Sequence, residues 1–172
     1  MRAFSFIICA FCLLSSGIAQ NKTSVDQLVS EKTYEIRSNW ASPLAGTTIA
    51  NMGLLPTGSD ANNISLIGNE NYLIKKGDEI DVFLPYYGEL RVAGRNLTNN
   101  TIKFKATVEK YKAKYNKSKK RHIISFKARH EQELYNFTIT LYSNHRSSVS
   151  ISSSKRSPIT YRGTVKEITS IE

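Results

Sequence analysis

Two groups of carboxylates, one of them beside a histidine, are the side chains of this sequence most capable of chemistry. The segment 130–133, HEQE, places an imidazole and two carboxylates close together, and such groups can hold a metal ion. Asp78, Glu79 and Asp81 form the second group, and paired carboxylates can hydrolyse glycosides. Both groups lie where alternating apolar residues stop, and no second cluster completes a coordination sphere. We therefore predict turns here, with no metal site, no cofactor site and no catalytic residue.

The sequence contains none of the local motifs that activate a nucleophile or cradle a phosphate. No Gly-x-Ser-x-Gly turn is present, and no glycine-rich loop follows a predicted strand. Both cysteines, Cys9 and Cys12, lie in an N-terminal apolar run. The sequence therefore favours a binding or envelope-associated protein over an enzyme. The alternative is an envelope hydrolase whose carboxylates converge from separate strands, which a linear pattern does not reveal.

The positive charge of the chain is concentrated in one segment. The formal net charge is +10, and residues 103–121 contain nine Lys and Arg against the single acid Glu109. The candidate basic patch consists of Lys112, Lys114, Lys117, Lys119, Lys120 and Arg121. Tyr111 and Tyr115 alternate with these lysines, a pattern that can bind an anionic polymer through charge and stacking.

Two interpretations of this basic segment remain open. In an exported protein the expected anionic partners are envelope glycans or lipid headgroups rather than nucleic acid. The alternative is structural: the tyrosines face the core, the lysines face water, and the charged tip prevents sheet edges from pairing between molecules.

The stretch DVFLPYYGEL, residues 81–90, interrupts an alternating strand with a proline and two aromatic residues. Pro85 has no amide hydrogen, so strand pairing should stop or bulge there, and Gly88 permits the turn that follows. Tyr86 and Tyr87 point to opposite faces of an extended chain, so we expect Tyr86 in the core and Tyr87 at the rim. Pro85, Tyr86, Tyr87 and Gly88 are the candidate binding rim. The alternative is a strand end closed by one aromatic plug.

The first 19 residues have the layout of a signal peptide. Arg2 precedes an apolar run, Phe4 to Leu14, and Gly17-Ile18-Ala19 supplies small residues before a predicted cleavage site at Gln20. The apolar run is shorter than the about 20 residues that cross a bilayer. We expect an exported protein that is periplasmic, at the cell surface or extracellular, and not transmembrane after cleavage. Residues 20–172 are long enough for a single β-rich domain.

The remaining pattern predicts one short helix followed by strands. Ser24 is a plausible N-cap for a helix within residues 23–32, and the long polar stretch 43–69 is expected to be a loop whose end is ordered. A hairpin is predicted at Lys76-Gly77-Asp78, and a one-residue change of phase within residues 101–115 predicts a bulge. Residues 34–40, 71–84, 101–115, 122–128, 134–142, 148–152 and 158–168 alternate as strands.

Successive hairpins of this kind build an antiparallel meander of about seven to nine strands, mainly β in class. Such a meander covers its apolar face by curling, by closing into a barrel, by folding into two packed sheets, or with help from the N-terminal helix. A curled or barrel-like sheet is favoured, and the pattern leaves its closure open.

Four of these segments, taken in order, resemble a family of small exported proteins from Bacteroidetes-type bacteria that is catalogued only as a domain of unknown function. The resemblance extends from about Gln27 to Val165. Its most recognisable motif is LPYFG-like and is matched by residues 84–88, LPYYG. Its terminal pattern is matched by Arg156, Ile159, Tyr161 and Gly163. The resemblance implies export and a β-rich fold, with no activity to carry over.

One departure from the family pattern falls in the hairpin that follows residues 134–142. A glycine is usual there, and Asn144-His145 takes its place. Asn tolerates the left-handed conformation, so we expect the turn to be retained.

Overall fold

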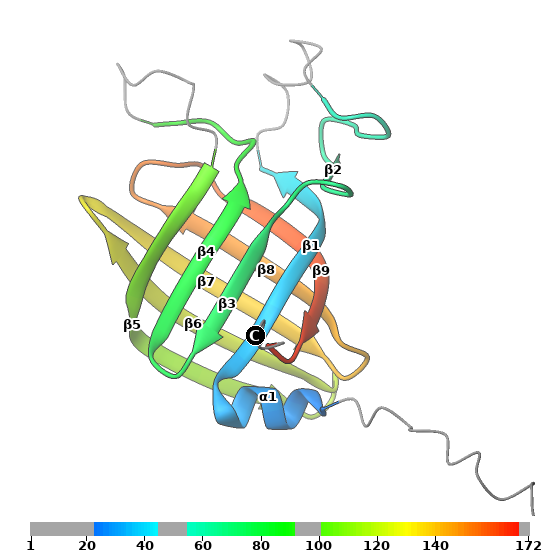
Figure 1. The fold of residues 1–172 in the computed structure, drawn as a ribbon, viewed down its shortest axis with the longest axis vertical. Coiled ribbons are helices and arrows are strands. Elements are labelled where there is room, and N and C mark those ends of the chain that lie inside the picture. The colour runs from blue at the N-terminus through cyan, green and yellow to red at the C-terminus, as the bar shows by residue number, and fades with distance from the viewer. Residues whose placement is uncertain (1–22, 45–54, 92–100, 169–172) are drawn as a thin grey trace, which may run out of the picture.

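The protein is an antiparallel β-barrel with one short helix at its end (Figure 1). The computed structural model describes residues 23–44, 55–91 and 101–168. Its elements are α1 (Val25–Glu31), β1 (Thr33–Pro43), β2 (Ile64–Ser65), β3 (Tyr72–Lys76), β4 (Glu79–Pro85), β5 (Thr101–Asn116), β6 (Arg121–His130), β7 (Glu133–Tyr142), β8 (Arg146–Ser153) and β9 (Ile159–Lys166). The predicted signal peptide lies outside the described residues.

Eight strands close the barrel. Strands β3 to β9 follow one another as a meander, and β1 pairs with β3 on one side and β9 on the other. The short β2 pairs with β1 near its end, where Trp40 faces Ser65. The predicted mainly β meander of seven to nine strands is confirmed, and the sheet is closed rather than merely curled. Closure pairs most strand edges, but among the described residues the stretch 112–116 of β5 has β6 as its only neighbouring strand.

The interior of the barrel is filled by side chains. Along β7 Tyr135, Phe137, Ile139 and Leu141 are buried while Asn136 and Thr138 are exposed, as the alternation predicts. Aromatic rings pack across the strands, and the rings of Phe126 and Phe137 stack 4.8 Å apart. An eight-stranded barrel is just wide enough for its own side chains. The structure therefore has a packed core in place of a ligand chamber.

Helix α1 lies at one end of the barrel (Figure 1) and buries Val25, Leu28 and Val29. The Ser24 hydroxyl caps the helix by accepting from the Gln27 amide at 3.2 Å, as predicted. We call this the helix end; because the strands are antiparallel, the β3–β4, β5–β6 and β7–β8 turns also lie here. The opposite, loop end carries the β4–β5, β6–β7 and β8–β9 connections. None of the described helices has the length and apolar character required to cross a bilayer.

Two bulges shape the wall. The predicted one lies in β5, where the register with β6 shifts between Glu109 and Lys112, and Lys110 has a φ of 54°. The other lies in β1, between Ser38 and Trp40, opposite β9. There Gly163 approaches so closely that a Cβ atom would stand 1.9 Å from the Arg37 carbonyl oxygen. Glycine is therefore required at this point of the β1–β9 seam.

Two predicted turns are confirmed, one with a different residue in the strained position. Gly77 and Asp78 connect β3 to β4, and Gly77 has a φ of 54°. In the β7–β8 turn His145, rather than Asn144, takes the left-handed conformation, with a φ of 64°. The Asn144 side chain accepts a hydrogen bond from the Arg146 amide at 3.2 Å. The turn therefore forms without a glycine, because His145 adopts the left-handed conformation and Asn144 adds a side-chain hydrogen bond.

Candidate functional site

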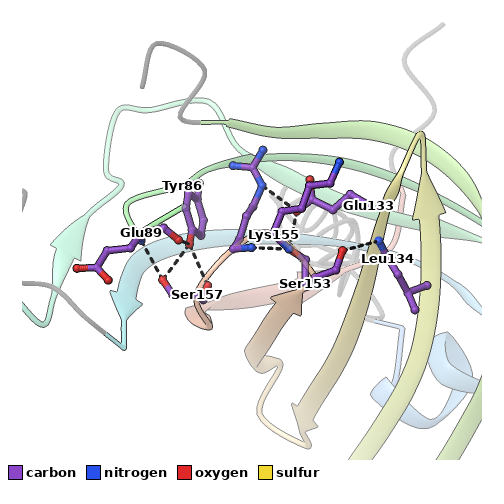
Figure 2. Close-up of polar contacts among 9 residues, drawn as sticks. Tyr86, Glu89, Glu133, Leu134, Ser153, Lys155 and Ser157 are labelled. Atoms are coloured by element: carbon purple, nitrogen blue, oxygen red, sulfur yellow. Dashed lines mark hydrogen bonds and ion pairs between the residues drawn. The ribbon is translucent and has the colours of Figure 1, made fainter. Parts of the chain in front are cut away.

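Tyr86 of the candidate rim is turned into the protein at the loop end. Its side chain is 1% exposed, and its hydroxyl lies 2.9 Å from the Glu89 carbonyl and 3.0 Å from the Ser157 carbonyl. The Ser157 hydroxyl in turn accepts from the Glu89 amide at 2.9 Å (Figure 2). Burial raises the pKa of Tyr86. Tyr86, Glu89 and Ser157, which we call the rim clasp, connect the segment after β4 to the β8–β9 connection.

Gly88 is needed for space above the clasp rather than for an unusual backbone conformation. A Cβ atom there would stand 2.4 Å from the Tyr86 hydroxyl oxygen and 2.7 Å from the Ser157 hydroxyl oxygen. Its φ does not lie in the left-handed region. The turn expected at Gly88 therefore depends on the absence of a side chain.

The other two rim residues, Pro85 and Tyr87, lie at the end of β4 and just beyond it. Pro85 is the last residue of β4, pairs with Thr101, and accepts a hydrogen bond from the Tyr161 hydroxyl at 2.8 Å. Tyr87 is half-buried and packs against the core from the edge. Burial raises its pKa. A partner-binding role for the rim stays a prediction, and Tyr87 is the residue that remains partly accessible for it.

A buried ion pair lies beside the rim clasp. Glu133 is 8% exposed and accepts from the Ser153 hydroxyl at 2.5 Å and from Arg156 Nε at 3.2 Å (Figure 2). The Arg156 guanidinium also lies 5.1 Å from the centre of the Tyr86 ring. Within the described part, Arg156 Nη1 is buried without a hydrogen-bond partner.

The hairpin turn predicted at HEQE is present, with Glu131 and Gln132 exposed, and His130 stays 42% exposed while it stacks on Phe104 at 5.3 Å. The interpretation as a solvated segment is wrong for Glu133, which is buried. A signal for Glu133 exists in the sequence, since it is in phase with the inward-facing Tyr135 and Phe137. Its partner Arg156 lies beyond another strand, so spacing alone does not connect the two.

The second carboxylate group lies at the helix end and on the outer wall. Asp78 pairs with Lys32 at 3.2 Å and Asp81 with Lys105 at 3.0 Å. Glu79 and Asp81 line one open hollow of about 440 Å³, but both come from β4. Among residues 23–44, 55–91 and 101–168, no group of three or more His, Cys, Asp or Glu side chains meets in metal-binding geometry.

The candidate basic patch lies on the β5–β6 hairpin, and we call residues 110–121 the basic hairpin. Its six lysines are exposed: Lys110, Lys112, Lys114, Lys117, Lys119 and Lys120. Arg121 is half-buried. The Asn116 side chain orders the tip by accepting from Ser118 Oγ at 2.9 Å and from the Lys119 amide at 3.0 Å. The tip is thus a defined turn that presents its cations to solvent.

The two tyrosines of the hairpin behave differently. Tyr111 packs against the core, where its ring stacks with Phe126 at 6.3 Å. Tyr115 is 51% exposed, so the expectation that it faces the core is wrong. After the bulge β5 bends and continues towards α1 at the helix end (Figure 1), and there it pairs with β6 alone, because β4 pairs only with residues 101–107.

A hollow of about 270 Å³ opens beside Tyr115, which we call the helix-end hollow. It is lined by the start of α1, the basic hairpin and the β7–β8 turn through Ser24, Val25, Asp26, Tyr115, Lys120, His122, Ser143 and His145. His122 Nε2 lies 2.5 Å from Asp26 Oδ1, and His145 Nε2 lies 2.9 Å from the Thr23 carbonyl oxygen. Two histidines thus fasten α1 to the barrel at this hollow.

The family-like segments meet in space at the loop end. Arg156 lies over Tyr86 of the LPYYG segment, and Tyr161 bonds to Pro85. Residues far apart in sequence therefore form one structural unit around the rim clasp. By its fold, the protein is a closed antiparallel β-barrel of eight strands with a helix at one end and a filled interior.

The chain belongs to the family described as a domain of unknown function (DUF4251), whose model matches residues 17–165. A crystal structure of a DUF4251 family protein from Bacteroides eggerthii is similar, with a TM-score of 0.55 and 12% sequence identity. The similarity covers 81% of this chain and 82% of that one and, at this identity, concerns the fold alone. The predicted family resemblance is confirmed. No match was found among curated proteins.

Proposed function

We propose that this protein is an exported, non-enzymatic module that binds clustered phosphate or carboxylate groups of the cell envelope through its basic hairpin. The observation that carries the proposal is the exposure of six lysines on one ordered hairpin. Glu109 is the only acid in the surrounding residues 103–121. A concentrated positive field attracts polyanions from a distance.

The packing of the barrel supports binding on its outside. The interior is filled by apolar side chains, and the two buried carboxylates of the described residues are already paired with neighbouring cations. Glu133 pairs with Arg156, while Glu35 pairs with Arg37 and, at 3.3 Å, with Lys166. A charged ligand therefore finds its free counter-charges on the surface, at the hairpin.

A vesicle-binding experiment with residues 20–172 tests the charge argument. The probes are vesicles with and without anionic phospholipid, and immobilised lipopolysaccharide. Changing Lys117, Lys119 and Lys120 to Gln should weaken binding about 100-fold, since each lysine near an anionic surface contributes about 1 kcal/mol. Binding should also fall as salt is added.

The matched control removes the same charge elsewhere on the barrel. Lys103, Lys127 and Lys155 lie outside the hairpin, and changing these three to Gln should alter binding less than threefold, an effect of only about 0.6 kcal/mol. Equal losses in both triple variants, or unchanged binding in the hairpin variant, would show that the hairpin is not the contact surface.

Export is tested separately through the N-terminus of the protein. When the full-length chain is expressed in a Bacteroides host, the protein recovered from the envelope or medium should begin at Gln20. Recovery of an intact Met1 chain in the cytoplasm would contradict the export part of the proposal, while leaving the charge argument to its own experiment.

A further inference from the structure

We infer that the helix-end hollow is a subsite for one sugar unit of an acidic polysaccharide whose charges are held by the basic hairpin. The inference rests on the proposed function and names its ligand class. Lys120 both lines the hollow and belongs to the hairpin, so the two surfaces are continuous. A polymer bound to the hairpin lysines therefore also lies next to the opening of the hollow.

Tyr115 supplies the stacking surface. It is the aromatic residue among the three large apolar side chains that the described part of the chain exposes, the others being Leu44 and Ile67. The Tyr115 ring contacts the His122 imidazole at 4.8 Å, with 49° between the planes, and half of its surface stays open to solvent. The flat face of a tyrosine ring matches the C–H face of a pyranose and offers little to an anion.

Polar groups around the ring match the hydroxyls of a sugar. The Asp26 side chain is 78% exposed, and its Oδ1 atom is held by His122. The Asp26 carboxylate accepts hydrogen bonds, Ser143 can donate or accept, and the Lys120 ammonium donates. A mixed set of donors and acceptors beside an apolar face is typical of a site that orients a polar ring.

The shape and charge of the hollow favour a polysaccharide over a lipid surface. At about 270 Å³ it lies just below the range of about 300 to 1,000 Å³ typical of drug-sized ligands, which suits a single ring. A membrane is flat and does not enter a concave site, and the exposed Asp26 carboxylate would face anionic headgroups with unfavourable charge. A uronate ring can instead direct its hydroxyls to the Asp26 carboxylate and its own carboxylate to the Lys120 ammonium.

Affinity measurements with three probes test the subsite. The probes are polygalacturonate, neutral pullulan, and vesicles containing anionic phospholipid. Tyr115→Ala should weaken polygalacturonate binding about tenfold or more, because stacking on an aromatic ring contributes about 1 to 3 kcal/mol. Its binding to vesicles should stay within about twofold, which corresponds to only about 0.4 kcal/mol. Tyr115→Phe should restore polygalacturonate binding, and the wild type should bind pullulan far more weakly.

Tyr142→Ala is the matched control, since Tyr142 is a partly exposed tyrosine at the same end of the barrel, in contact with Arg146. It should leave polygalacturonate binding unchanged. The subsite is overturned if Tyr115→Ala binds polygalacturonate as the wild type does, if both tyrosine variants lose it equally, or if the wild type binds vesicles alone. Loss of binding in the hairpin lysine variant, together with intact binding in Tyr115→Ala, would overturn the subsite and leave the proposed function standing.

Discussion

Tyr86 and Tyr87 of the rim are adjacent in sequence but lie in different environments, and this difference determines how much each contributes to stability. The Tyr86 side chain is enclosed and its hydroxyl bonds within the protein, while Tyr87 contacts the core and stays partly open. Their neighbour Gly88 cannot carry a side chain without displacing the Tyr86 hydroxyl. The main role of the LPYYG segment is therefore structural: it holds the chain after β4 to the β8–β9 connection at the loop end.

The two tyrosines should therefore respond differently to truncation. Tyr86→Ala should lower the free energy of unfolding by about 3 to 5 kcal/mol, the cost of removing a buried aromatic side chain. Tyr87→Ala should cost clearly less. Urea denaturation of both variants measures the difference. Equal destabilisation would mean that Tyr87 is also a core residue and would remove it as the accessible residue of the rim.

The buried ion pair between Glu133 and Arg156 acts at the scale of elements, because it ties the start of β7 to the β8–β9 connection. Glu133→Gln should lower the free energy of unfolding by about 1 to 3 kcal/mol, since it leaves the partly buried Arg156 guanidinium without its counter-ion. Chemical denaturation checks this value.

A neighbouring residue provides the control for this ion pair. Glu131→Gln changes an exposed turn residue, which should shift stability by less than about 0.5 kcal/mol. In the double variant Glu133→Gln/Arg156→Gln, the loss should be smaller than the sum of the two single losses. Additive losses would show that the two side chains do not act as a pair.

Local elements were largely predictable because their signals are local. Ser24 with Val25 and Leu28 predicted α1, and the change of phase before Tyr111 predicted the β5 bulge. The exposure of Tyr115 was not predictable, because alternation along a strand does not tell where the strand leaves the barrel.

Barrel closure depends on a contact between residues far apart in the chain. It requires Gly163 to approach the β1 bulge at Ser38, about 120 residues earlier, and neither segment signals the other. The candidate sites followed the same rule. The basic hairpin could be identified from sequence, whereas the helix-end hollow could not, because it combines the start of α1, the basic hairpin and the β7–β8 turn.

At the scale of the whole molecule, buried tyrosines link stability to alkaline pH. Burial raises the pKa of Tyr34 and Tyr161 above that of an exposed tyrosine, about 10. The unfolded chain releases these protons above about pH 10 while the folded protein keeps them. The stability that each buried, protonated tyrosine contributes is therefore fully present below that pH. As the pH rises further, the free energy of unfolding falls by about 1.4 kcal/mol per pH unit for each tyrosine.

Tyr34→Phe isolates this effect. In the described part of the structure the Tyr34 hydroxyl is buried without a hydrogen-bond partner, so its removal should leave stability at pH 7 unchanged or raised. Above pH 10 the variant should lose stability less steeply than the wild type. Tyr161→Phe is the comparison, because it also loses the hydrogen bond to the Pro85 carbonyl. Its free energy of unfolding at pH 7 should therefore be lower than that of the wild type. A Tyr34→Phe profile as steep as that of the wild type would contradict the argument.

The pairing of β1 with β9 also sets the order in which the protein can be completed. Strand β1 can pair with β9, its second neighbour, only after residues 159–166 have been synthesised. A nascent or truncated chain that ends before Ile159 exposes β1 and β8 as open edges, which are templates for aggregation. Folding of this barrel is accordingly a late event dominated by contacts of high sequence separation, and such chains fold slowly. Cellular factors that keep the chain extended until its last strand emerges would therefore raise the yield of native protein.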